Sequence, residues 1–307
     1  MAAVRVTQRL LVDRILNNLS DQSRELLKLQ DQLATGRRVN KPSDDPLAAR
    51  RALNAQNEIS ANDQYITNIS TISPGLLESE TTSLSVVDML QRARELTLQG
   101  ANGTNAQEQL DQIAIEVNQL LEGVLNQGNQ ITNDRYIFGG TRTSNPPFVA
   151  TRDASGEITS VAYEGNDEDI LIEISEGVQV VSNATGESVF QSTSASTVDI
   201  FQMLIDVRDN LRAGDSNGLQ TRLEELTMAQ DQLLLAVSRL GATQNRINRV
   251  EDNLSIVNVQ LQEVLSDNVD ADFAEVTLNL NAQFNAYQAA LNAGARVIQP
   301  SLLDFVR

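Results

Sequence analysis

The adjacent carboxylates of Asp44 and Asp45 are the side chains of this sequence that could most readily do chemistry, as an acid–base pair or as metal ligands. Asp45, however, directly precedes Pro46, and this order is typical of a helix N-cap followed by the first helical residue. A second acidic run, Asp267 to Asp272, loosely resembles a calcium loop. It lacks the glycine that such a loop needs at its sixth position, and Leu278 stands where the closing glutamate is required. We therefore interpret both runs as helix caps, where negative charge suits the helix dipole.

The composition excludes most other kinds of active site. The chain of 307 residues has no Cys and no His, which excludes zinc or haem sites built on those residues and the Ser-His-Asp and Cys-His triads. Gly139-Gly140 is not accompanied by the Lys-Ser/Thr pair of a phosphate-binding loop, so we interpret it as a turn. The sequence thus predicts no catalytic residue, no cofactor and no metal.

The charge is strongly negative and unevenly distributed. The net charge of −18 argues against nucleic-acid binding. The first 51 residues hold ten Lys/Arg and six Asp/Glu, whereas the rest of the chain carries a net charge of −22. Two interpretations stay open: a solvated helix face, or a basic N-terminal helix that pairs with an acidic segment.

The N-terminal residues are not expected to form a secretion signal. Arg5, Arg9, Asp13 and Arg14 lie where a signal peptide needs an apolar core. No stretch approaches the roughly 18 apolar residues of a membrane span. We expect no membrane insertion.

Long helices with apolar residues at alternating steps of three and four would carry these caps, and that spacing is the pattern of a coiled-coil seam. In the N-terminal helix the predicted assembly seam comprises Val12, Ile15, Leu19, Leu26, Leu29 and Leu33, with Gln22 at the missing position. In two later helices it comprises Leu254, Val257, Leu261 and Val264, and then Phe273, Leu280, Phe284, Tyr287 and Leu291.

Glycine and proline predict where the helices end. Gly36 permits the left-handed backbone that closes the first helix. Ser73-Pro74-Gly75 is predicted to interrupt or bend the helix that follows Pro46. The remaining predicted helices span 76–99, a segment from Thr104 or Asn105 to about 133, 198–212, 219–266 and 273–298, the last closed by Pro300.

The apolar pattern of the sequence changes from helical spacing to short runs near residue 138. Short apolar runs at Ile158–Tyr163, Ile170–Ile174 and Val178–Val181 are separated by turn residues and predict strands. The expected fold is mainly α, an elongated antiparallel helical rod with terminal coiled-coil helices and a small β-rich inserted domain. Its predicted parts are terminal assembly segments at 1–43 and 267–307, a rod at 44–137 and 197–266, and an outer domain at 138–196.

Several motifs in this order resemble bacterial flagellins and their hook-associated relatives. Leu33 to Asn40 with Ser43-Asp44-Asp45 is similar to the N-terminal signature of that family, and Leu90 to Gln99 is similar to its rod helix. Asp270 to Ala274 and Leu302-Leu303 match the C-terminal part. Three segments resemble the hook-associated branch at the hook–filament junction more than they resemble filament flagellin. They are Lys41 to Pro46, Asn133 to Thr141 and Gln299 to Arg307.

This resemblance implies a structural protein that leaves the cell unfolded through the flagellar export channel. It would form a ring-like layer between the first hook-associated protein and flagellin, outside the cell. An export chaperone would hold the last helix around Phe273 to Leu291. The resemblance also implies a rod packing surface at Arg92, Leu96 and Glu116, which in flagellin is read by an innate immune receptor.

Three alternatives stay open. The chain could be a short flagellin that builds the filament itself. It could be an enzyme with a hydrolase site in the central β-rich module, although no convergent polar set supports this. The acidic module could also serve in adhesion.

Overall fold

The computed structural model describes residues 2–103, 105–191 and 198–298, and helices dominate these residues. The chain divides into two compact units. The terminal unit comprises residues 1–61 and 256–307, and the central unit comprises residues 62–255. The described residues confirm the predicted class, mainly α with a few small antiparallel strand pairs.

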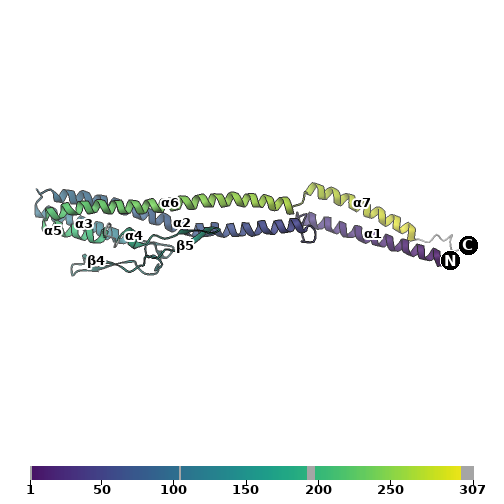
Figure 1. The fold of residues 1–307 in the computed structure, drawn as a ribbon, viewed down its shortest axis with the longest axis horizontal. Helices are drawn as coiled ribbons and strands as arrows, with labels where there is room; N and C mark the ends of the chain where they lie inside the picture. Colours follow the sequence, from purple (N-terminus) through teal and green to yellow (C-terminus); the bar gives the residue numbers. More distant parts are fainter. Residues whose placement is uncertain (1, 104, 192–197, 299–307) are drawn as a thin grey trace. The chain divides into compact units, whose positions relative to one another are not determined.

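The terminal unit is built on a pair of helices from the two ends of the chain. Helix α1 (Ala2–Thr35) lies beside α7 (Phe273–Ile298), as Figure 1 shows in purple and yellow. The unit also contains the first residues of α2 (Pro46–Ala101) and the last residues of α6 (Ser216–Val269). The predicted stop at Pro300 lies outside the described residues.

The joint between α1 and α2 follows local sequence rules. Gly36 adopts a left-handed backbone with φ of 69°, as predicted. Asp45 caps α2, because its Oδ1 accepts the backbone N–H groups of Leu47 at 3.1 Å and Ala48 at 3.0 Å. The Asp44 carboxylate accepts the N–H groups of Asn40 and Lys41. Asp45 therefore caps α2 as predicted, whereas Asp44 holds the backbone of the joint that precedes the helix.

The central unit is a helical rod with three β-hairpins attached. Its core joins α2 and α6 to α3 (Gln107–Gly128) and α5 (Ile200–Ala213), with Leu90, Val117, Leu204 and Leu226 fully buried. Because each helix turns one apolar stripe inward, the buried area stabilises the unit without a continuous sheet.

The hairpins are each two-stranded and antiparallel, and they follow one another along the chain. They pair β1 (Ile131–Thr132) with β2 (Arg135–Tyr136), β3 (Phe148–Arg152) with β4 (Ile158–Tyr163), and β5 (Leu171–Ser175) with β6 (Val178–Val181). A short helix, α4 (Gly186–Val189), follows the three hairpins, and we call the hairpins and α4 together the hairpin module. Five aromatic rings pack together where this module meets α5: Phe138, Phe148, Tyr163, Phe190 and Phe201.

Three details of the predicted elements are wrong. Helix α2 runs through Pro74 without a break, because Ile72 and Leu76 on either side of it are buried in the core. Helix α3 begins after Ala106 and ends at Gly128, well before residue 133. The residues that follow make the first hairpin instead, where Asn133 and Asp134 both have positive φ, as a tight hairpin turn requires.

Candidate assembly surfaces

The predicted seam of α1 faces α7. The two helices are antiparallel, since Arg37 pairs with Asp270 at one end and Ile15 approaches Gly294 near the other. A Cβ on Gly294 would lie 3.0 Å from Cγ2 of Ile15, so glycine permits the helices to approach closely. All six predicted positions are sheltered: Leu29 is buried, and Val12, Ile15, Leu19, Leu26 and Leu33 are half-buried.

The predicted seam of α7 is only partly the one that faces inward. Leu280 and Tyr287 are half-buried, but Phe273, Phe284 and Leu291 are exposed at 65%, 48% and 44%. The sheltered positions form a different heptad: Val276, Leu280, Gln283, Tyr287, Ala290 and Gly294. The apolar residues of α7 form a stripe that is wider than the surface α1 covers. The spacing alone therefore did not identify which of these residues contact α1.

An apolar stripe is left exposed on the terminal unit. Phe284 and Leu291 directly follow inner seam positions of α7, and Leu16 directly follows Ile15 on α1. In an antiparallel pair such positions on the two helices flank the same side of the seam. Leu16, Leu27, Phe284 and Leu291, which we call the terminal apolar stripe, are all at least 44% exposed. Such a stripe is suited to cover by a further helix.

The α1 seam contains one polar layer. Oε1 of Gln22 is buried and has no hydrogen-bond partner within the described residues. The register set by Ile15 and Gly294 places Gln22 one heptad away, at the level of Tyr287. A buried polar group in a seam lowers stability and favours one register over its neighbours.

The joint ties the two ends of the chain together. The backbone carbonyl oxygen of Val269 accepts hydrogen bonds from the N–H groups of Arg38 at 2.7 Å and Val39 at 3.3 Å. The backbone carbonyl oxygen of Gly36 accepts one from the N–H of Ala271 at 2.9 Å. The guanidinium of Arg38 also donates to the carbonyl oxygen of Asn268. The start of α2 and the end of α6 are therefore held at one level by backbone bonds, which the sequence did not predict.

The joint carboxylates have pKa values below their ordinary range. For Asp44 the main cause is the N–H of Lys41, with a smaller effect of the nearby Lys28 and Lys41 ammonium groups. For Asp45 the main cause is the N–H of Ala48, followed by the hydrogen bond from Arg38. Each bond favours the charged carboxylate.

The α6 seam is shifted from the predicted one. Leu254 is buried and Val257 and Leu261 are half-buried, but Val264 is exposed. Asn258 and Leu265 take the sheltered positions instead. A straight helix drifts relative to a strict seven-residue repeat, so the inner face moves along the rod.

The predicted rod packing surface is only partly a surface. Arg92 pairs with Glu116 at 2.8 Å and with Glu95 at 3.0 Å, and these side chains are exposed by about half. Leu96, in contrast, is 2% exposed and belongs to the core, because it lies on the inner face of α2. The inclusion of Leu96 in that surface was wrong.

Three arginines fix the β3–β4 hairpin to the rod. Arg152 forms a two-pronged pair with Glu122, and Arg212 pairs with Glu157 at 2.5 and 2.6 Å. The Arg212 guanidinium lowers the pKa of the Glu157 carboxyl. Arg208 is buried and donates to the carbonyl oxygen of Ile158 at 2.8 Å. The sequence contained one signal for these contacts, since Arg208 and Arg212 lie four residues apart on an amphipathic helix. This spacing does not predict which residues the two arginines bind.

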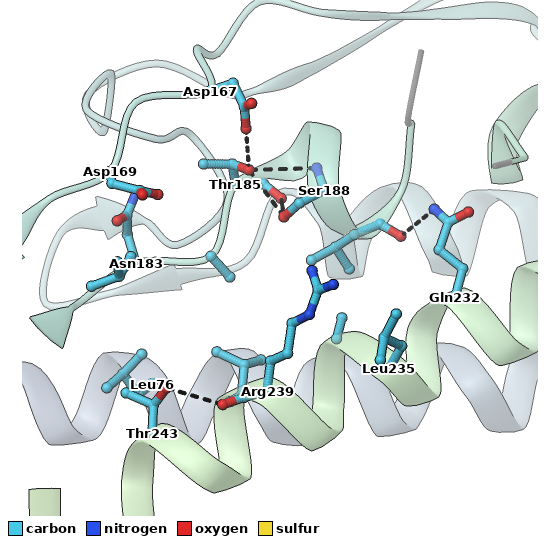
Figure 2. Close-up of a pocket in the computed structure, with 15 residues that line it drawn as sticks. Leu76, Asp167, Asp169, Asn183, Thr185, Ser188, Gln232, Leu235, Arg239 and Thr243 are labelled. Atoms are coloured by element: carbon cyan, nitrogen blue, oxygen red, sulfur yellow. Dashed lines mark hydrogen bonds between the residues drawn. The ribbon is translucent and has the colours of Figure 1, made fainter. Parts of the chain in front are cut away.

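A cleft of about 630 Å³ lies between the hairpin module and α6 (Figure 2). Oγ1 of Thr185 lies 2.5 Å from Oδ1 of Asp167, which superficially resembles a nucleophile beside a base. The same oxygen accepts the N–H of Ser188 and caps α4, so its role is structural. Arg239 projects from α6 on the opposite wall. The arrangement offers polar contacts but no acid–base pair aimed at a common point.

Within the described residues no group of three or more acidic, His or Cys side chains is placed to hold a metal ion. The described helices include none that is both long and apolar enough to span a membrane.

The two ends of the chain match known families. Residues 10–143 match the family described as the bacterial flagellin N-terminal helical region, and residues 223–306 match the bacterial flagellin C-terminal helical region. Together they cover more than half of the chain.

Individual relatives differ in how much of the chain they match. The flagellar hook-associated protein 3 of Escherichia coli (strain K12) is 26% identical over 312 residues, covering 94% of this chain and 96% of that protein. Flagellin FlaB1 of Treponema pallidum is 26% identical over 262 residues, covering 82% and 88%. A flagellin of Salmonella muenchen is 36% identical over only 112 residues, covering 35% and 21%.

Solved structures share the fold. FlgL of Bacillus cereus has a TM-score of 0.58 at 26% identity and covers 69% of this chain and 99% of its own. A flagellar hook-associated protein from Vibrio parahaemolyticus has a TM-score of 0.64 at 22% identity and covers 74% and 100%.

Proposed function

This chain belongs to the bacterial flagellin family, and we propose that within it the protein is the junction adaptor that joins the flagellar hook to the filament. The observation that carries the proposal is the extent of similarity. The match to a hook-associated protein 3 covers nearly the whole of both chains, whereas the Salmonella muenchen flagellin matches only about a third of this one.

The exposed surfaces support a structural role in an assembly. The terminal apolar stripe leaves Phe284 and Leu291 in water in the single chain, and cover by a neighbouring helix would remove them from it. We propose that these residues form assembly contacts of a ring-like layer, while the α1 seam holds α1 against α7 within each copy. On the rod, Arg92 and Glu116 are the exposed candidates for packing between copies.

The proposed role implies partners and a place. The first hook-associated protein would lie on one side of the layer and flagellin on the other, outside the cell, after passage through the flagellar export apparatus. Before export, a chaperone that covers α7 from Phe273 to Leu291 would prevent premature association, since these side chains are exposed in the isolated chain.

A short flagellin is the second candidate. The match to flagellin FlaB1 covers 82% of this chain and 88% of that protein, which is less of both chains than the hook-associated match covers. The two candidates differ in where the protein lies and in how many copies are present.

Immunogold electron microscopy of intact flagella tests the proposal, with antibody against residues 138–195. The adaptor predicts one band of label where hook meets filament. Label along the whole filament would instead support the flagellin role. A strain that lacks the protein serves as the control for antibody specificity.

A further inference from the structure

The chain has only two lysines, and both lie at one cleft. Lys28 on α1 and Lys41 in the joint line a hollow of about 490 Å³ in the terminal unit. Asp44 lines the same hollow, and both ammonium groups help to lower the pKa of its carboxyl. All other cations of the sequence are arginines or the N-terminus. The cleft thus holds every lysine of the protein.

The carboxylates of this cleft are already occupied by amide donors. Oδ2 of Asp31 accepts a hydrogen bond from Nδ2 of Asn40, and Oδ2 of Asp44 accepts two backbone N–H groups. Neither lysine ammonium donates to a hydrogen-bond or ion-pair partner within the described residues. The ammonium groups are therefore the part of the cleft that can still pair with an anion, and the exposed Leu27 beside them offers an apolar contact.

The complementary charge lies at the end of α6 and in α7, in the same unit. Residues 256–295 hold five carboxylates and no lysine or arginine. Glu263, Asp267 and Glu275 among them are exposed and have no hydrogen-bond partner for their carboxylates within the described residues. The cleft itself is lined only by α1 and the joint, so these acids of the same chain do not line it.

The basic cleft and the acidic residues both border the joint of the terminal unit. The joint bonds place Arg37 opposite Asp270 and Arg38 beside Val269. Lys41 follows Arg38 by three residues, and Asp267 precedes Val269 by two. A second copy placed beside this joint would bring the acids of one copy to the lysines of the next. Such a contact joins different surfaces on the two copies, and therefore extends to further copies around a ring or helix.

We propose that the cleft of Lys28 and Lys41 receives the acidic edge formed by Glu263, Asp267 and Glu275 of a second copy of this chain. The inference rests on the proposed assembly role and names a contact for it. Charge complementarity of this kind sets which surfaces meet and in what register.

Amine labelling tests whether the cleft is covered. A brief pulse of an acetylating ester is applied to the purified chain and to isolated flagella, and acetylation of Lys28 and Lys41 is measured by mass spectrometry. We expect both lysines to react in the single chain and to be protected in flagella. An Arg142→Lys variant adds a reference lysine on the exposed hairpin module, which should react equally in both samples.

A carbodiimide identifies the occupant, because it joins a contacting amine and carboxylate as an amide with loss of water. We expect a covalent dimer whose linked peptides join Lys28 or Lys41 to Glu263, Asp267 or Glu275. The Lys28→Arg/Lys41→Arg variant keeps both charges but has no side-chain amine to couple. It should assemble normally and lose the dimer.

Charge reversal supplies an independent measurement. Lys28→Glu/Lys41→Glu should reduce the amount of the chain in purified flagella by about tenfold, since two exposed pairs become repulsive. Adding Glu263→Lys and Asp267→Lys should restore it.

Three outcomes would overturn the inference. The chain could be present in flagella with both lysines as reactive as in the single chain, which leaves the proposed function standing. Cross-links could lead only to acids of another protein. Complete absence of the chain from flagella would overturn the proposed function as well.

Discussion

Replacing Arg208 by methionine removes the buried link between the β3–β4 hairpin and the rod. The side chain is 4% exposed and donates to the carbonyl oxygen of Ile158 at 2.8 Å and to Oδ1 of Asn118 at 3.1 Å. Methionine fills a similar volume but donates nothing. The ion-pair partner Asp209 is mostly exposed and returns to water. The cost therefore comes from the two oxygens that lose their donor.

The magnitude follows from burial. A buried acceptor left unpaired costs about 1–3 kcal/mol, and the half-buried Asn118 recovers part of this from water. Methionine also avoids the desolvation of a guanidinium, which offsets part of the loss. We expect the free energy of unfolding of the central unit to fall by about 2–3 kcal/mol, which corresponds to a decrease in Tm of roughly 5–10 °C.

Urea unfolding followed by circular dichroism measures this difference, and amide hydrogen exchange in β4 locates it. Arg212→Met is the matched control, because it lies one turn along α5 and removes a more exposed pair with Glu157. That pair should contribute about 1 kcal/mol or less. If Arg208→Met is no more destabilising than Arg212→Met, the buried hydrogen bonds do not hold the hairpin.

Three further predictions concern the terminal unit. Gly294→Leu would drive a side chain into Ile15, so we expect loss of the chain from purified flagella without a change in the Tm of the central unit; normal incorporation would contradict the close approach. Phe284→Ser with Leu291→Ser should leave the unfolding free energy of the single chain within about 0.5 kcal/mol, because both side chains are exposed, yet reduce incorporation several-fold; retained incorporation would exclude the terminal apolar stripe as a contact. Because the pKa of Asp45 is lowered in the folded state, its stabilising effect is present above the unfolded value of about 3.9 and is lost as pH falls through the folded value. An acid titration of helicity should show this loss, and Asp45→Asn should remove that part of the dependence.

Local sequence determined much of the terminal unit. The cap at Asp45, the left-handed Gly36 and the sheltered seam of α1 were all predicted, because each depends on the conformational preferences and spacing of residues close together in the chain. The mainly helical class and the strands near 158–163, 171–175 and 178–181 follow from the same kind of signal.

Tertiary structure decided which apolar face turns inward. Phe284 and Tyr287 have equally good heptad spacing, but only Tyr287 is sheltered by α1. Pro74 lacks the N–H that a helix interior uses, yet the burial of Ile72 and Leu76 carries α2 through it. In both cases packing between distant segments outweighs a local preference.

The partners of the anchoring arginines were likewise set by the fold alone. Arg208 meets Ile158 and Arg152 meets Glu122 across separations of 50 and 30 residues. A sequence pattern records which residues can donate or accept, but the pairing depends on which surfaces the folded backbone brings together. The sequence by itself therefore determined the Asp45 cap, the spacing of the α1 seam and the fold class. The start of α3, the inner face of α7, the unbroken α2 and the attachment of the hairpins required the packed structure.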